Sequence, residues 1–340
     1  MKKILVTGGL GYIGSHTVVE LQRNNIDVII IDNLSNSSEE VLKGIHSISG
    51  ITPSFVKLDL RDKEDVVNFF EANSDIEGII HFAASKAVGE SVEDPLLYYE
   101  NNINTLVLVL QECKKHQINN FIFSSSCTVY GEPDSLPITE QAPVKKATSP
   151  YGNTKQISEN IIFDFCSVSN LKSIALRYFN PIGAHESSEI GELPLGVPLN
   201  LVPFITQTAA GVREQLSVYG DDYPTVDGSC VRDYIHVVDL AKAHVVALKR
   251  LLEDKNKTNF EVFNLGTGRG SSVLEVINSF EKVTHQKLNY KIVERRPGDV
   301  VSVFADTKKA NDVLGWKTER TMEDALLTAW NWEKKVRNLK

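Results

Sequence analysis

Lys3-Ile-Leu-Val-Thr-Gly-Gly-Leu-Gly-Tyr-Ile-Gly14 decides the fold of this chain, because it joins a short apolar segment to a glycine-rich turn. Residues 3–7 predict a buried strand, and the helical periodicity of residues 15–21 predicts a helix directly after the turn. Glycines at this point let backbone N–H groups approach a pyrophosphate at the start of the helix. We therefore predict a dinucleotide site whose contacts come from Gly8, Gly11, Tyr12, Ile13 and Gly14.

An acidic residue ends the second predicted strand, which spans residues 27–32. Asp32 lies about 20 residues past the turn, where a carboxylate accepts hydrogen bonds from ribose hydroxyls and repels a 2′-phosphate. We therefore predict NAD rather than NADP, with Asn33 and Asn36 further along the adenosine.

Strands and helices alternate up to about residue 180. Further strands are predicted at 55–60, 78–84, 119–126 and 172–178, and helices at 62–72, 95–116 and 150–168. The alternation predicts an α/β fold with a Rossmann-type, doubly wound parallel sheet. Beyond residue 180, proline and glycine interrupt shorter elements. We expect an NAD-binding domain at 1–180 and a smaller α/β substrate domain at 181–340, with some of its segments returning to the first sheet.

The ends of the later strands carry small and polar residues that leave room for a cofactor. Asp59 is placed to reach the adenine amine, next to Leu60. Phe82 and Ala83 end the fourth predicted strand. His81 in that strand is more typical of a hydrogen-bonded core residue than of a catalytic one.

Ser149-Pro150-Tyr151-Gly-Asn-Thr-Lys155 carries the chemistry. A proline at a first helical position puts Tyr151 and Lys155 on one face, one turn apart. A lysine charge at about 6 Å favours the phenolate by about 3 kcal/mol, or about 2 pKa units, at an effective dielectric of about 20. The pair predicts a base that takes a proton from a hydroxyl while hydride leaves the same carbon.

Composition restricts the function classes. The net charge of −8 gives no electrostatic support to a nucleic-acid role. The four cysteines are scattered without a C-x-x-C spacing, which favours a reducing compartment and argues against a metal site. The apolar start is too short for a signal peptide or membrane helix, so we expect a soluble cytoplasmic protein.

The chain resembles the extended short-chain dehydrogenases/reductases, and within them the UDP-glucose 4-epimerase family along nearly its whole length. The motifs that carry the resemblance are Thr7–His16, His81–Ala83, Lys86–Ser91, Ser124–Gly131, Tyr151–Lys155, Arg177–Pro181, Gly228–Val237, Asn264–Gly268 and Arg295–Asp299.

The resemblance implies reversible C4 epimerisation of a UDP-hexose through a 4-keto intermediate with tightly bound NAD. Tyr151 is then the base, Lys155 lowers its pKa and binds nicotinamide ribose, and Ser126 bonds the C4 oxygen. Further implied cofactor contacts are Lys86, Asn101, Ser124 and Tyr178. Arg232 and Arg296 suit the diphosphate, and Tyr219 the uracil. The remaining implied substrate contacts are Lys86, Asn180, Asn200, Leu201, Asp299 and Val303.

Two positions refine this expectation. Related dehydratases carry an acidic pair where this chain has Cys127 and Thr128, which argues against dehydration. Val303 corresponds to a pocket residue whose small size admits a C2 acetamido group, so UDP-N-acetylglucosamine and UDP-N-acetylgalactosamine are expected as further substrates.

The alternatives are another nucleotide-sugar enzyme, a dehydratase or decarboxylase, and a non-catalytic NAD-binding regulatory protein, since fold alone does not establish function. An intact Ser126, Tyr151 and Lys155 argues against the last. The helices at 95–116 and 150–168 match those that pair in family homodimers, so a homodimer is expected.

Overall fold

The computed structural model describes residues 3–296 and 299–339, which divide into two compact units. The first unit holds the residues up to Glu132, then Glu140–Tyr178 and Ala241–Asn264. The second holds Pro133–Thr139, Phe179–Leu240 and the residues from Leu265 onward. In this part of the chain no helix has the length and apolar character that a membrane span requires.

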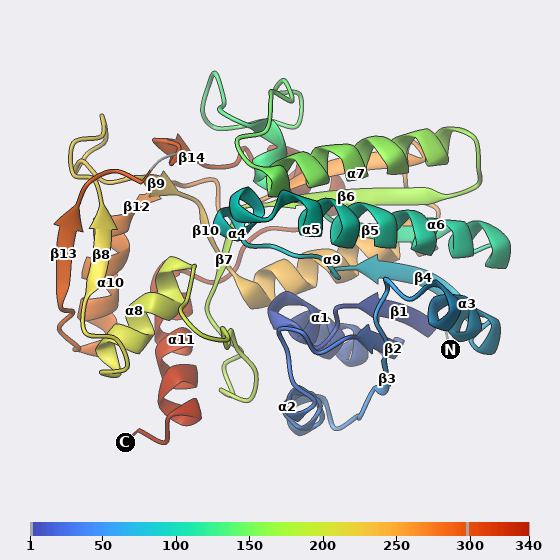
Figure 1. The fold of residues 1–340 in the computed structure, drawn as a ribbon, viewed down its shortest axis with the longest axis horizontal. Coiled ribbons are helices and arrows are strands. Elements are labelled where there is room, and N and C mark those ends of the chain that lie inside the picture. The colour runs from blue at the N-terminus through green and yellow to red at the C-terminus, as the bar shows by residue number, and fades with distance from the viewer. Residues whose placement is uncertain (1–2, 297–298, 340) are drawn as a thin grey trace. The chain divides into compact units, whose positions relative to one another are not determined.

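The first unit is built on a seven-stranded sheet with the order β11-β6-β5-β4-β1-β2-β3. Every pair from β6 across to β3 is parallel, which confirms the predicted α/β class. The strands (Figure 1) are β1 (Lys3–Thr7), β2 (Asp27–Asp32), β3 (Ser54–Lys57), β4 (Ile76–His81), β5 (Asn120–Ser124), β6 (Lys172–Tyr178) and β11 (Phe260–Leu265).

The register aligns the carboxyl ends of these strands. Thr7 pairs with Ile31 on one side and with His81 on the other, and His81 pairs with Phe123. The residues that end or follow these strands therefore gather at one edge of the sheet, where open α/β sheets bind their ligands.

The helices of the first unit are α1 (Tyr12–Arg23), α2 (Glu40–Ser49), α3 (Lys63–Ala72), α4 (Val88–Glu93), α5 (Pro95–Tyr99), η1 (Glu100–Asn104), α6 (Thr105–His116), η2 (Cys127–Tyr130), α7 (Pro150–Ser167) and the greater part of α9 (Val237–Leu252). One apolar cluster joins α3, α6 and α7 to the sheet through Phe70, Leu106 and Ile162. Figure 1 shows α7 running beside α5 and α6, so the helix that carries Tyr151 is packed along much of its length.

Two predicted details need correction. The helix expected at 95–116 is helical throughout that range, but η1 is a π-helical stretch in its middle, and no sequence pattern indicated it. The strand expected at 55–60 ends at Lys57 instead. The Leu58 N–H still donates to the Asp32 carbonyl at 3.1 Å, and the chain then turns at Leu60 and Arg61 before Asp62 caps α3.

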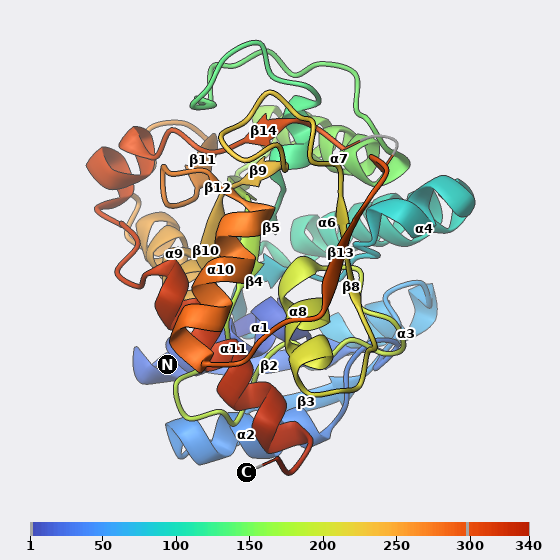
Figure 2. The same ribbon diagram turned by 90° about the vertical axis from the view of Figure 1, so that its left-hand side faces the viewer.

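The second unit contains β7 (Asn180–Ile182), α8 (Leu201–Ala209), β8 (Leu216–Tyr219), β9 (Val231–Arg232), β10 (Tyr234–His236), β12 (Ser271–Ser272), α10 (Val273–Thr284), β13 (Tyr290–Val293), β14 (Ser302–Val303), η3 (Ala310–Leu314) and α11 (Met322–Val336). Its core packs Ile205, Phe280 and Trp330 from three helices. Figure 2 shows β8 and β13 side by side, and they pair in parallel. The strands β12, β9 and β14 form a separate small sheet.

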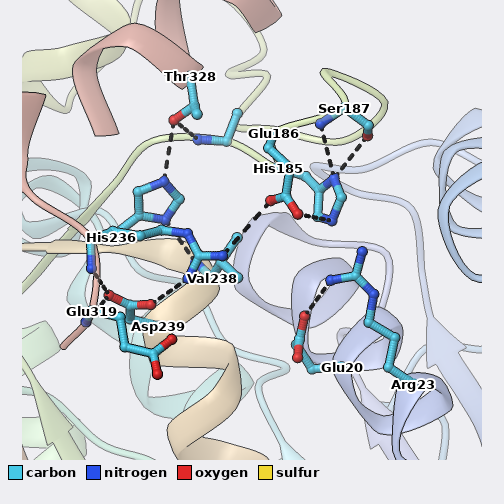
Figure 3. Close-up of polar contacts among 12 residues, drawn as sticks. Glu20, Arg23, His185, Glu186, Ser187, His236, Val238, Asp239, Glu319 and Thr328 are labelled. Atoms are coloured by element: carbon cyan, nitrogen blue, oxygen red, sulfur yellow. Dashed lines mark hydrogen bonds and ion pairs between the residues drawn. The ribbon is translucent and has the colours of Figure 1, made fainter. Parts of the chain in front are cut away.

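A buried polar network anchors the start of α11 (Figure 3). Asp239 accepts hydrogen bonds from the backbone N–H groups of Glu319 and Arg320, both at 2.8 Å, and from the Arg320 side chain at 2.6 Å. His236 Nδ1 accepts from the Val238 N–H at 3.1 Å, and its Nε2 lies 3.3 Å from the Thr328 hydroxyl. Burial lowers the pKa of His236 to about 4, so this imidazole is neutral in the folded unit.

Candidate active site

The first turn of α7 sets the spacing of the two central side chains. Ser149 is the N-cap, and its hydroxyl accepts a hydrogen bond from the Gly152 N–H at 3.1 Å. Pro150 occupies the first turn, where its missing N–H costs nothing. Tyr151 and Lys155 consequently lie four residues apart on one buried face, as the sequence predicted.

Lys155 is held in a closed environment between α7 and the sheet. Its Nζ donates to the Ser124 carbonyl at 2.8 Å and lies 4.9 Å from the centre of the Phe123 ring. The same Nζ is 5.8 Å from the centre of the Tyr151 ring. Burial lowers the pKa of Lys155 to about 8, and the charge of Glu159 opposes that effect.

The environment of Tyr151 adds a burial cost that the motif does not show. Burial raises the pKa of the Tyr151 phenol above its ordinary value, and a hydrogen bond with Ser126 only partly offsets this. A charged Lys155 favours the phenolate, and its pKa of about 8 leaves it charged at neutral pH. A phenolate at this position therefore needs both a protonated Lys155 and a further positive charge.

Serine residues at the end of β5 complete the centre. Ser126 follows the strand, is buried and bonds Tyr151. Ser124 and Tyr178 share a hydrogen bond of 2.5 Å between their hydroxyls. Cys127 and Thr128 follow in η2, where the Thr128 N–H donates to the Ser126 hydroxyl at 3.2 Å. The structure thus brings together Ser124, Ser126, Tyr151, Lys155 and Tyr178.

The glycine turn has the close packing that a pyrophosphate cradle requires. Gly8 has φ of +69°, and a Cβ there would lie 2.9 Å from the Ala83 nitrogen. A Cβ on Gly14 would lie 2.3 Å from the Gly8 carbonyl oxygen. Gly11 is the N-cap of α1 and provides no side-chain cap, so the N–H groups of Tyr12 and Ile13 begin the helix with the dipole favouring an anion.

The acidic residues predicted for the adenosine lie at the neighbouring strand ends. Asp32 is buried and accepts from the backbone N–H groups of Leu10 at 3.1 Å and Leu34 at 2.9 Å. The Ser37 hydroxyl donates to Asp32 Oδ1 as well, at 2.8 Å. The bond from Leu10 ties the carboxylate to the glycine turn, and Oδ2 keeps an acceptor position for a ribose hydroxyl. Asp59 accepts from Arg61 and Asn33, and the Arg61 hydrogen bond holds its pKa near 2, well below the ordinary value. Leu60 is buried beside it, and Asn36 is exposed.

The loop after β4 holds the remaining predicted cofactor residues. The Phe82 ring centre lies 4.7 Å from that of His244, and Ala83 follows it. Asn101 donates to the Ser85 hydroxyl at 2.8 Å. Asn102 fixes the backbone beside the exposed Lys86, because it accepts from the Ser85 N–H at 2.8 Å and donates to the Ser85 carbonyl at 3.0 Å. His81, by contrast, hydrogen-bonds Thr7, and burial lowers its pKa to about 3, so it is a neutral core residue as expected.

The second unit gathers several of the predicted substrate residues. Asp299 contacts Arg296 at 2.8 Å and Arg232 at 3.7 Å, and the Arg296 guanidinium lies 5.3 Å from the Tyr219 ring centre. Val303 pairs with Arg232 across β14 and β9 and is buried. Residues 297 and 298 of the Arg295–Asp299 motif lie outside the described residues.

Three other predicted substrate residues lie on separate elements of that unit. Asn180 is in β7 and donates its backbone N–H to the Asp233 carbonyl at 2.9 Å. Asn200 is exposed and donates to Glu192 at 2.7 Å, and Leu201 begins α8 directly after it.

The helix before the sixth strand carries the Tyr-x-x-x-Lys pair and a serine follows the fifth strand, as in the extended short-chain dehydrogenases/reductases that the sequence resembles. The geometry above places this chain in that class. The family model described as GDP-mannose 4,6 dehydratase matches residues 5–328.

Known proteins narrow the assignment. The UDP-glucose 4-epimerase of Bacillus subtilis (strain 168) is 50% identical over 331 residues, which cover 97% of this chain and 96% of the relative. The crystal structure of the Stenotrophomonas maltophila UDP-glucose-4-epimerase with bound NAD and formylated UDP-arabinopyranose is 43% identical, with a TM-score of 0.95 and 99% of each chain covered. That of the Bifidobacterium longum enzyme with NAD+ and UDP is 46% identical, with a TM-score of 0.94 and the same coverage. The chain belongs to the UDP-glucose 4-epimerase family.

Proposed function

We propose that this protein interconverts UDP-glucose and UDP-galactose by inverting C4 of the hexose, with NAD as a firmly held cofactor. The observation that carries the proposal is the meeting of Tyr151, Lys155 and Ser126 at the sheet edge that also bears the glycine turn. The 50% identity to a relative of that activity supports it.

The glycine turn and Asp32 suit NAD, because a Cβ at Gly8 or Gly14 would crowd the turn and the Asp32 carboxylate would repel a 2′-phosphate. NAD, when bound, supplies a hydride acceptor for C4 and a positive charge that favours the Tyr151 phenolate. Further contacts with the cofactor are proposed for Asp59, Lys86, Asn101 and Tyr178.

The side chains of this chain handle the proton and the substrate. Tyr151 takes the proton of the C4 hydroxyl as the C4–H bond breaks, which leaves a 4-keto sugar. Ser126 donates a hydrogen bond to the C4 oxygen, and Lys155 keeps the phenolate charge favourable. Inversion requires the keto sugar to present its other face, so the hexose is held loosely and the nucleotide firmly.

Residues of the second unit are proposed to bind the nucleotide part of the substrate. Arg232 and Arg296 bind the diphosphate through bidentate N–H donors. Asp299, which contacts both guanidinium groups, holds them ready for that contact. Tyr219 contacts the uracil, and the sugar nucleotide is further held by Asn180, Asn200 and Leu201.

The test is incubation of the purified protein with UDP-galactose and no added coenzyme, with UDP-glucose measured by chromatography. Formation of UDP-glucose by the wild type and its loss in Tyr151→Phe are the expected results. Absence of UDP-glucose from the wild type, even after NAD is supplied, would refute the proposal.

The size of Val303 supports a wider substrate range. Because valine leaves room that a tyrosine would fill, UDP-N-acetylgalactosamine is proposed as a second substrate. Val303→Tyr is expected to lose turnover of the acetamido sugar while keeping that of UDP-galactose. Normal turnover of UDP-galactose by the wild type with none of the acetamido sugar would contradict this extension.

A homodimer is proposed to form through the helices α5, α6 and α7. Leu96 on α5 is 76% exposed and Phe163 on α7 is 57% exposed, and large apolar side chains exposed on these helices fit a surface that a second copy covers. Light scattering on the purified protein is expected to give twice the chain mass of 37.8 kDa. A monomer at working concentration would rule out the dimer.

A further inference from the structure

A buried ion pair lies beside the serine segment, and sequence reasoning missed it. Glu159 is on α7, one turn past Lys155. Its carboxylate accepts from Arg177 Nε at 2.9 Å and from Arg177 Nη2 at 2.5 Å, and both side chains are 7% exposed. The Ser125 hydroxyl donates to the same carboxylate at 2.5 Å. One carboxylate therefore ties α7 and β6 to the residue between Ser124 and Ser126.

The arginine braces the same segment from its other end. The Arg177 guanidinium lies 4.8 Å from the centre of the Tyr130 ring, and Tyr130 is the last residue of η2, the short helix after Ser126. The Tyr130 hydroxyl donates to Asn264 at 2.6 Å, which fixes the ring. The pair thus contacts Ser125, directly before Ser126, and Tyr130, four residues after it.

Burying two charges is costly, and replacing such a pair with apolar residues is often neutral or stabilising. Stability alone therefore gives a weak reason for this arrangement. The electrostatic surroundings of Lys155 give a stronger one. The titratable and charged groups that act on Lys155 are Tyr151 and Glu159 on α7 and His81 on β4. Beyond them, Tyr178 on β6, Cys127 on η2 and Tyr98 on α5 surround Tyr151, and Arg177 on β6 pairs with Glu159.

Of those groups, Glu159 supplies the negative charge. His81 is neutral because burial lowers its pKa to about 3, and the buried phenols have raised pKa values. Lys155 is itself buried, so its ammonium form depends on a nearby anion. Residues four apart on a helix are close enough for that interaction.

We propose that Glu159, held by Arg177, is a positioning residue for the C4 chemistry: its carboxylate keeps Lys155 charged and fixes Ser125 so that Ser126 faces Tyr151. This inference rests on the proposed epimerase function. Glu159 touches neither substrate nor cofactor in this account and acts through its neighbours.

The test is the pH profile of kcat/KM for UDP-galactose in Glu159→Gln. Removal of the carboxylate disfavours the ammonium form, so the pKa of Lys155 falls and the alkaline limb moves to lower pH. A charge removed at about 8 Å, at an effective dielectric of about 20, is worth about 2 kcal/mol and gives a shift of about 1.5 pH units. At pH values above both limbs, kcat/KM of the variant is then about thirtyfold lower than that of the wild type.

Glu261→Gln is the matched control. Glu261 forms the same bidentate pair with Arg250, at 2.7 and 3.0 Å, in the same unit and with side chains 8% and 10% exposed. It lies on β11 and is not among the groups around Lys155. We expect it to lose stability without any shift of the alkaline limb.

The double variant Glu159→Gln/Arg177→Met leaves no buried unpaired charge and guards against misfolding of the single variant. It is expected to fold by circular dichroism and to show a limb shifted in the same direction. If the variants fold and their alkaline limbs coincide with that of the wild type, this inference is wrong but the proposed function stands. If neither variant folds, the pair serves stability, and the inference is wrong as well. An inactive wild type would instead overturn the proposed function and this inference with it.

Discussion

Replacing Lys155 with methionine tests how the phenol of Tyr151 becomes a base. Methionine keeps an unbranched apolar stem in the space between α7 and β5 and removes the ammonium. Lys155 Nζ lies 5.8 Å from the Tyr151 ring centre. At an effective dielectric of about 20, a charge at that distance stabilises the phenolate by about 3 kcal/mol. The fraction of phenolate at a fixed pH should therefore fall about 100-fold.

The loss depends on pH in a defined direction. Because the pKa of Lys155 is about 8, the wild-type lysine is charged at lower pH and loses its charge above that value. The full difference between wild type and Lys155→Met is expected near neutral pH. It should shrink as the pH rises, because the wild type loses the charge that the variant lacks and more phenol ionises in both.

Initial rates of UDP-glucose formation from UDP-galactose measure the effect across the neutral and alkaline range. Acid release of NAD from each preparation shows whether the variant still holds its cofactor, and Tyr151→Phe provides a control that alkaline pH cannot rescue. The electrostatic reasoning would be refuted by a Lys155→Met variant that retains NAD and whose initial rate differs from that of the wild type by the same factor at every pH.

Three further changes test the fold and the cofactor site. Gly14→Ala places a Cβ 2.3 Å from the Gly8 carbonyl oxygen and should give protein with little NAD, measured after acid release. Asp239→Asn removes the charged acceptor of three hydrogen bonds and should lower the free energy of unfolding in urea by about 3 kcal/mol. His236 binds a proton near pH 6.5 in the unfolded chain and only near pH 4 in the folded chain. Its contribution to the free energy of unfolding is therefore complete above about pH 6.5 and falls by about 3 kcal/mol as the pH drops to about 4. His236→Gln should flatten that decline, and an unchanged slope in urea titrations would contradict the assignment.

Local sequence patterns predicted the elements that carry the site. The apolar run and glycine turn predicted β1 and the start of α1, because both depend on neighbouring residues alone. Asp32 ends β2 as expected, and Ser149 and Pro150 begin α7 through capping chemistry that is visible in the sequence.

Long-range packing decided what the sequence could not show. Some segments beyond residue 180 were expected to return to the first sheet, but only the packing shows that residues 260–265 do so, as β11 beside β6. The pairing of Glu159 with Arg177 depends on how α7 lies against the sheet, although the position of Glu159 one turn past Lys155 was a usable signal. The raised pKa of Tyr151 follows from burial, which two residues of a motif do not reveal.

The fate of the hydrogen on C4 tests the central claim most directly. UDP-galactose carrying deuterium at C4 is incubated with the protein in ordinary water, and the UDP-glucose formed is examined by mass spectrometry and NMR. We predict that the label stays at C4, because that hydrogen leaves and returns while the sugar nucleotide remains bound. UDP-glucose that has exchanged its C4 hydrogen with solvent would contradict it.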